Sequence, residues 1–150
     1  MSIRFVERPG VSTQVWKCFG LTTADRDDRR RHVQRELART GLPFEVQVAD
    51  RPTEAGGFAS IGQRGCFDSH LRALRAARDQ DVDVALIVED DAVIVRRFPD
   101  LLDQVQRELA DRSWSVLLLG YLPRESPSKV FPIEPISPHV GRSRHWEIGR

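Results

Sequence analysis

The feature that most constrains the fold is an apolar run at residues 84–88, VALIV, followed directly by Glu89, Asp90 and Asp91. A continuous apolar run of strand length is typical of a strand that is buried on both faces of a parallel sheet. Three adjacent carboxylates repel one another, so the end of such a strand needs a cation or several hydrogen-bond donors nearby. The segment therefore predicts a polar site beside a buried strand.

Strand patterns and helix patterns alternate along the rest of the chain. The predicted strands are residues 14–21, 44–48, 84–88 and 114–120, and the predicted helices are residues 25–40, 66–79 and 98–109. This alternation predicts an α/β fold, with a mainly parallel sheet, right-handed crossovers and helices on both faces. Ligands of such sheets bind beyond the carboxyl ends of the strands. We therefore expect the site in the loops at 22–26, 49–64 and 89–97.

Composition and charge exclude several classes of function. The 150 residues carry 23 basic and 22 acidic side chains, a net charge of +1, which removes the usual electrostatic basis for nucleic-acid binding. No apolar run approaches the ~20 residues of a membrane-spanning helix, and the charged N-terminus lacks a signal-peptide pattern. We therefore expect a cytoplasmic protein. Cys18 and Cys66 lie too far apart for a zinc or redox motif and are expected to be buried free thiols.

The C-terminal part of the sequence differs from the rest. Residues 121–150 contain five of the nine prolines and show no periodic pattern. A structureless tail of this length is uncommon in a compact domain. We therefore expect it to begin a missing second half of the fold or, as the less favoured alternative, to pack irregularly over the sheet. The predicted division is a ligand-binding α/β domain at 1–120 and an irregular segment at 121–150.

The acidic triplet is a candidate metal site. If strand geometry continues past residue 88, Glu89 and Asp91 point to one side and Asp90 to the other. Carboxylates are the preferred ligands of hard cations such as Mg²⁺ and Mn²⁺, which take substrate phosphates as further ligands. The alternative is a solvated acidic turn that binds no ligand.

A second polar group opens the helix predicted at 66–79. Ser69 and His70 are adjacent, so they do not face one another on a helix, whereas Cys66 and His70 are four residues apart and can touch. A Cys-His nucleophile pair is one interpretation. A core histidine whose ring nitrogens are satisfied by the backbone is the alternative that these residues alone favour.

Arg26 and Arg29 belong to an arginine cluster in the first turns of the helix predicted at 25–40. The free N–H groups and the dipole of a helix N-terminus favour an anion, so these arginines are candidates for gripping a diphosphate. Asp25, Asp27 and Asp28 lie among them. Local ion pairs on a solvated helix face are therefore the alternative.

Three blocks of the sequence, in order, resemble glycosyltransferase family 25, the bacterial lipooligosaccharide sugar transferases related to the collagen galactosyltransferases. The blocks are GCFDSHLR at residues 65–72, ALIVEDDAV at 85–93 and WSVLLLG at 114–120. Residues 21–30 and the pair Ala49-Asp50 resemble the family more loosely, and the whole resemblance covers residues 15–120.

This resemblance implies a fold of GT-A type that lacks its C-terminal part, and a hexosyltransferase activity. The implied donor is a nucleotide sugar, a UDP-hexose first, and the implied acceptor is a lipooligosaccharide or lipopolysaccharide type of glycan. The acidic motif would hold Mn²⁺ or Mg²⁺ at Glu89, Asp90 and Asp91. The implied nucleotide-sugar contacts are Leu21, Arg26, Arg29, Asp50, Ser69 and His70.

Two other functions compete with this one: a non-catalytic or truncated nucleotide-sugar-binding module, and a structural fragment with no ligand. A lipid-linked acceptor implies peripheral association with the inner face of a membrane. The sheet edge left open by missing strands favours self-association. No catalytic base is assigned. We expect the 150-residue chain alone to transfer little or no sugar, because the missing half would hold the acceptor in line.

Overall fold

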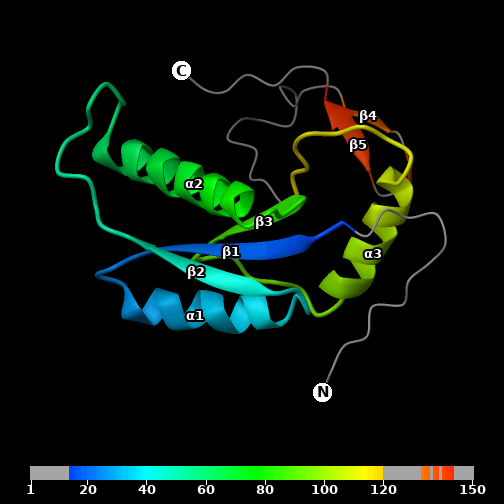
Figure 1. Ribbon diagram of the computed structural model, residues 1–150, viewed down its shortest axis with the longest axis horizontal. Coiled ribbons are helices and arrows are strands. Elements are labelled where there is room, and N and C mark those ends of the chain that lie inside the picture. Colours follow the sequence, from blue (N-terminus) through cyan, green and yellow to red (C-terminus); the bar gives the residue numbers. More distant parts are fainter. Residues whose placement is uncertain (1–13, 120–132, 136, 139, 144–150) are drawn as a thin grey trace. The chain divides into compact units, whose positions relative to one another are not determined.

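The computed structural model describes residues 14–119, 133–135, 137–138 and 140–143 (Figure 1). The elements are β1 (Trp16–Thr23), α1 (Asp27–Ala38), β2 (Phe44–Ala49), α2 (Ile61–Asp79), β3 (Val84–Glu89), α3 (Phe98–Leu109), β4 (Ile133–Pro135) and β5 (Gly141–Ser143). The chain forms two compact units, Met1–Pro99 and Asp100–Arg150. The predicted division at residue 120 stays a prediction, since residues 120–132 lie outside the described part of the chain.

The first unit contains a parallel sheet of three strands in the order β2-β1-β3. The central strand β1 pairs in parallel with both neighbours, with Gly20 opposite Val46 on one side and Val88 on the other. The crossovers run through α1 and α2. The predicted α/β class with a parallel sheet is therefore confirmed, and the architecture is consistent with a GT-A-like nucleotide-sugar transferase fold.

The strand that is buried on both faces is β1, not β3. Cys18 and Phe19 of β1 are fully buried, and Leu21 is nearly so. The VALIV run forms β3, in which only Val88 is buried and the other four residues of the run are half-buried. The prediction for residues 84–88 was wrong on this point because β3 pairs only with β1 among the described strands, which leaves its other edge without a strand.

The strand predicted at residues 114–120 does not form. Residues 112–119 contain no helix or strand, and Gly120 lies outside the described residues. Val116 is 76% exposed, and Leu118 and Leu119 are exposed as well. An apolar run satisfies its backbone as a strand only when a neighbouring strand pairs with it, and no strand of the described residues pairs with this one.

The two helices of the first unit cover opposite faces of the sheet (Figure 1). Val33 and Leu37 of α1 pack against Cys18 on one face. Ala73 and Ala77 of α2 pack against the alternate residues of β1 on the other face, including Phe19. Successive residues of a strand point to opposite faces, so β1 supplies the core of both sides. Helices on both faces were predicted.

Helix α2 begins five residues earlier than the predicted start at residue 66. Ser60 is its N-cap, and the Ser60 hydroxyl accepts a hydrogen bond of 3.1 Å from the backbone N–H of Gln63. Gly62 and Gly65 weaken the helical pattern of the first turns. The hydrogen bond of the Ser60 cap stabilises the first turn more than the two glycines destabilise it, so the helix begins at Ile61.

The second unit contains α3 and a two-stranded antiparallel sheet of β4 and β5. Helix α3 lies at the predicted residues, and it buries Leu102 and Leu109. The Ser137 hydroxyl donates a short hydrogen bond to the Glu108 carboxylate and accepts one of 3.1 Å from the Val140 N–H. Among the described residues, no helix has the length and apolar character to cross a membrane.

Candidate functional site

A cavity of about 410 Å³ opens at the carboxyl ends of the three parallel strands, where the topology predicts a ligand site. Its wall consists of strand ends, the loop that follows β2 and the first turns of α2. Six of the nine predicted site residues line it: Leu21, Asp50, Ser69, His70, Glu89 and Asp90. The other three, Arg26, Arg29 and Asp91, are not among its lining residues.

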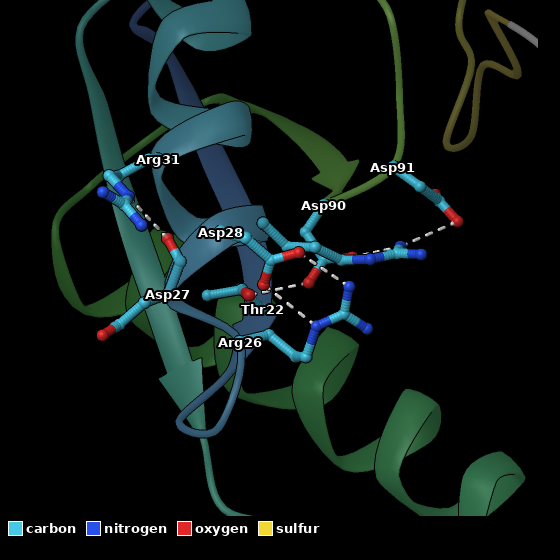
Figure 2. A network of polar contacts seen from close by, with 8 residues as sticks. Thr22, Arg26, Asp27, Asp28, Arg31, Asp90 and Asp91 are labelled. Carbon is cyan, nitrogen blue, oxygen red and sulfur yellow. Dashed lines mark hydrogen bonds and ion pairs between the residues drawn. The ribbon is translucent and has the colours of Figure 1, made fainter.

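On the α1 side of this edge, Asp90 is held by hydrogen bonds to both carboxylate oxygens (Figure 2). The Thr22 hydroxyl donates to Oδ2 at 2.6 Å, and Arg29 Nη1 donates to Oδ1 at 3.0 Å. Arg29 Nη1 also lies 3.2 Å from Asp91 Oδ2. The Asp90 side chain is 17% exposed and that of Asp91 65% exposed, so the guanidinium joins an inner and an outer carboxylate.

Helix α1 also fixes the chain that follows the acidic motif. His32 Nε2 lies 2.9 Å from the carbonyl oxygen of Ala92, and the buried Glu36 carboxylate accepts a hydrogen bond of 2.7 Å from the N–H of Ile94. Arg29, His32 and Glu36 are spaced by three and four residues and lie on one face of the helix. That face holds the segment after β3 in place.

The Arg26 side chain is hydrogen-bonded to a residue of the helix that it precedes (Figure 2). Its guanidinium donates to Asp28 at 3.0 and 2.9 Å. These hydrogen bonds hold the pKa of the Asp28 carboxyl far below its ordinary value of 3.8. Local pairing, the alternative considered for the arginine cluster, therefore describes Arg26, whereas Arg29 reaches across to the acidic motif.

The acidic triplet does not continue the strand geometry. Glu89 Oε1 lies 4.0 Å from His70 Nε2 and 3.9 Å from Cys66 Sγ, on the α2 side, whereas Asp91 contacts Arg29 of α1. The expectation that Glu89 and Asp91 share one side was wrong. The strand ends at Glu89, and the chain then turns, with the N–H of Ala92 bonded to the Glu89 carbonyl oxygen at 3.1 Å.

The first turns of α2 present Cys66, Ser69 and His70 to the cavity. Cys66 is exposed, so only Cys18 fulfils the expectation of a buried thiol. Burial raises the pKa of both thiols, and the nearby Glu89 carboxylate raises that of Cys66 further. The Ser69 hydroxyl donates to the carbonyl oxygen of Gly65 at 2.8 Å and is therefore engaged within its helix.

His70 is a cavity residue and not a core histidine. Its side chain is 38% exposed, and its Nδ1 lies 2.9 Å from the carbonyl oxygen of Cys66 and 3.7 Å from Cys66 Sγ. The predicted contact between Cys66 and His70 is therefore confirmed. The core interpretation was wrong because the helix face that carries His70 turns toward the strand ends rather than onto the middle of the sheet.

Sequence reasoning missed the role of Thr22 and gave Cys66 no role as a ligand. Thr22 is buried and lies one residue past the predicted end of the first strand, so the true strand end at Thr23 would have placed it beside the acidic motif. The spacing of Cys66 and His70 was visible, but their meeting with Glu89 depends on how α2 packs beside β3.

An α/β unit with polar residues gathered at the carboxyl ends of its parallel strands has the architecture in which ligands bind at that edge, and it is consistent with a GT-A-like nucleotide-sugar transferase. A family model described as glycosyltransferase family 25 (LPS biosynthesis protein) matches residues 51–126, just over half of the chain. The chain belongs to glycosyltransferase family 25. No curated protein and no solved structure gives a match.

The family consists of glycosyltransferases of lipopolysaccharide biosynthesis. Membership therefore implies, in general terms, a nucleotide-sugar donor and a glycan acceptor. The matched segment contains α2 and β3, and with them Cys66, His70 and the acidic motif. It begins after β1 and α1, which supply Thr22 and Arg29. The family match therefore covers the α2 side of the cavity more fully than the α1 side.

Proposed function

We propose that the chain binds a nucleotide-sugar donor, with a UDP-hexose as the first candidate, in the cavity at the strand ends. The donor's hexose would pass to a glycan acceptor of the lipopolysaccharide type. The observation that carries this proposal is the convergence of six predicted residues on one cavity. A volume of about 410 Å³ lies in the range of small-molecule sites, about 300–1,000 Å³.

In this proposal, Glu89, Asp90 and Asp91 would hold a divalent cation, Mn²⁺ or Mg²⁺, once the side chains of Glu89 and Asp91, which lie on the α2 and α1 sides, turn toward Asp90. Their carboxylate oxygens are the donor set that such hard cations prefer, and Glu89 and Asp90 line the cavity. A divalent cation at a diphosphate supplies charge neutralisation on the leaving group as the sugar departs. Thr22 and Arg29 hold Asp90 in place at the cavity wall, which supports its position for that role.

The remaining predicted residues divide by side. Leu21, near the end of β1, and Asp50, directly after β2, are proposed to contact the nucleoside. Ser69 and His70 of α2 are proposed to contact the sugar-phosphate part. Arg29 is the stronger candidate for the diphosphate because its guanidinium, which can match phosphate oxygens bidentately, reaches the acidic motif at the strand ends, whereas Arg26 pairs with Asp28 of α1.

A second candidate function is donor binding without transfer. It is favoured by the ion pairs of Arg29 with Asp90 and Asp91, because a guanidinium that is already paired with these carboxylates competes with a catalytic cation for them. Transfer also needs an acceptor hydroxyl held in line, which is worth about 7–11 kcal/mol of barrier. We expect the 150-residue chain to bind donor and to transfer little or no sugar.

Calorimetric titration of UDP in the presence of Mn²⁺ tests the proposal, with Asp91→Ala as the key variant. Asp91 is 65% exposed, so its removal leaves the fold intact, and we expect UDP affinity to fall by about tenfold or more. The matched control is Glu54→Ala, an exposed acid away from the cavity lining. Equal affinity of the wild type and Asp91→Ala would contradict the metal assignment.

A donor-turnover assay separates the two candidate functions. UDP-hexose is incubated with the chain in the presence and absence of a lipooligosaccharide acceptor, and released UDP and glycosylated acceptor are measured separately. Binding without product supports the binding module. Robust transfer by this chain supports the transferase and contradicts the expectation that it transfers little or no sugar.

A further inference from the structure

Three different metal-ligating groups meet on the α2 side of the cavity. The Cys66 thiol, the His70 imidazole and the Glu89 carboxylate offer ligand atoms that all lie within 4.8 Å of one another. Cys66 Sγ lies 3.9 Å and His70 Nε2 4.0 Å from Glu89 Oε1. Among the described residues, no other group of three such side chains converges in this way, and the acidic triplet does not.

The fold brings these groups together for simple reasons. Cys66 and His70 are four residues apart on α2, so they lie one above the other on the same helix face. Glu89 is the last residue of β3, and α2 packs against this strand through Ala73 and Ala77. The helix face and the strand end are both parts of the same compact unit.

The tautomer of His70 suits a ligand. Its Nδ1 lies 2.9 Å from the carbonyl oxygen of Cys66, a group that only accepts hydrogen bonds, so Nδ1 carries the proton and donates. The lone pair of the neutral ring is then on Nε2, the nitrogen nearer Glu89 Oε1 in the ion-pair geometry. Metal-binding histidines regularly donate their other ring N–H to a carbonyl or carboxylate in this way.

We propose that Cys66, His70 and Glu89 form a binding site for Zn²⁺ on the α2 side of the cavity, which needs no donor to be occupied and shares only Glu89 with the proposed Mn²⁺ or Mg²⁺ site. A thiolate and an imidazole favour zinc over the hard cations that carboxylates alone select. Zinc bonds of about 2.0–2.3 Å at tetrahedral angles hold ligand atoms about 3.3–3.6 Å apart. The contacts of 3.9 and 4.0 Å to Glu89 Oε1 approach that spacing, and the three ligand atoms, which all lie within 4.8 Å of one another, would reach it by side-chain rotation.

The proposed site has three protein ligands and therefore an open fourth position. All three residues line the cavity, so this position is reached from it. Zinc sites with three protein ligands keep water or a ligand atom in the fourth place, whereas structural sites are closed by four. The site is thus of the open type.

Zinc alone is the probe that tests this inference. The full chain, reduced with a phosphine that does not bind metal, is titrated with Zn²⁺ against a chromophoric chelator, and Co²⁺ is used as a spectroscopic substitute. We expect one equivalent of zinc to bind and the cobalt form to show a thiolate-to-metal charge-transfer band. Loss of a hydrogen-bond partner of a ligand costs about 10–100-fold in metal affinity. Cys66→Ser and His70→Gln, which remove a ligand itself, should lose at least about tenfold.

Matched controls separate the site from general effects. Cys18 remains in Cys66→Ser, so a buried thiol is present in every sample. His32→Gln removes a histidine that contacts Ala92 instead of the cavity, and it should bind zinc as the wild type does. Circular dichroism and thermal unfolding show whether each variant is folded, and the exposure of Cys66 makes Cys66→Ser the variant least expected to unfold.

Three results would overturn the inference: no zinc binding by the wild type, unchanged zinc affinity in folded Cys66→Ser, or a cobalt form without the charge-transfer band. The result for Asp91→Ala distinguishes this site from the proposed donor site. If that variant loses zinc as well as UDP while Cys66→Ser retains zinc, the zinc occupies the acidic motif, and the Cys66 site does not exist.

Discussion

The two faces of the sheet pack their helices in opposite ways. On the α1 face, β1 presents the small residues Cys18 and Gly20, and the bulk comes from Val33 and Leu37 of α1. On the α2 face, the bulk comes from the strand, at Phe19, and the helix contributes the small Ala73. Both arrangements fill the core, but they distribute volume differently between strand and helix.

The same faces also differ where the strands end. On the α1 side, both oxygens of Asp90 are bound by Thr22 and Arg29 at 2.6 and 3.0 Å. On the α2 side, Glu89 is 60% exposed and meets its neighbours only at 3.9 Å or more. The Asp90 carboxylate on the α1 side is thus already held by short hydrogen bonds, whereas the Glu89 carboxylate on the α2 side has only longer contacts.

The largest expected effect concerns the α2 face of the core. Phe19→Ala removes a fully buried ring and should lower the free energy of unfolding by about 3–5 kcal/mol. Phe67→Ala is the matched control, since Phe67 is exposed and its ring contacts Phe58 at a centroid distance of 5.3 Å. It should cost about 0.5–1.5 kcal/mol. Urea denaturation measures both values, and similar losses would contradict the assigned core.

The next effect concerns the α1 face. A Cβ at Gly20 would lie 2.8 Å from Leu37 Cδ1 and 3.0 Å from Val33 Cγ2, so Gly20→Ala should destabilise by about 1–3 kcal/mol. Gly62→Ala is the control, because its new Cβ would meet only Ser60 Oγ, at 3.8 Å. The free energy of unfolding of this variant should be unchanged or slightly higher. A Gly20→Ala protein as stable as the wild type would show that the two faces tolerate volume equally.

A smaller effect contrasts the two sides of the acidic motif. Asp90→Asn weakens charge-assisted hydrogen bonds to Arg29 and Thr22 and should cost about 1–2 kcal/mol of unfolding free energy. Glu89→Gln alters an exposed side chain and should stay within about 0.5 kcal/mol. Thermal unfolding of the two variants side by side measures the difference. A larger loss for Glu89→Gln would reverse the assignment of the structural and the ligand-binding side.

Much of the fold was predictable because the signals were local. Apolar periodicity over short windows predicted most ends of β1, α1, β2, β3 and α3 to within two residues of their observed positions. The start of α2 was missed because Gly62 and Gly65 obscured the cap at Ser60. The strand predicted at 114–120 failed because a strand needs a partner, and the sequence window contains no information on where that partner lies.

The candidate site was predictable in composition but not in orientation. The rule that ligands bind at the carboxyl ends of parallel strands brought Leu21, Asp50 and Asp90 to one cavity. The side on which Asp91 lies depends on the turn after Glu89, and the exposure of Cys66 depends on how α2 packs. Both are tertiary effects that strand alternation and residue spacing do not contain.

The smallest expected effect concerns the start of β1, on the sheet face that α2 covers and at the opposite end of the strand from the cavity. Lys17 Nζ lies 2.6 Å from Glu45 Oε2, and Gln80 donates to the same oxygen at 3.2 Å. The hydrogen bond from Lys17 is the main cause that lowers the pKa of Glu45 below its ordinary 4.5. A lowered pKa in the folded state means that the carboxylate stabilises the fold above the ordinary pKa, and this contribution is lost as the pH falls through the lowered value.

Replacement of Glu45 by Gln should therefore cost about 0.2–1 kcal/mol of unfolding free energy near neutral pH, the usual worth of a partly exposed ion pair. Urea denaturation of the wild type and Glu45→Gln between about pH 6 and about pH 3 measures the difference, which should shrink as Glu45 becomes protonated in the wild type. Asp111→Asn, a change at an exposed acid after α3, is the control and should alter the free energy of unfolding near neutral pH by less than about 0.5 kcal/mol. A difference that stays constant over this pH range would mean that Glu45 acts through packing and not through its charge. The contacts of Glu45 at the start of β1 would then stabilise the fold by side-chain packing, as on the α1 face, and not by the ion pair with Lys17.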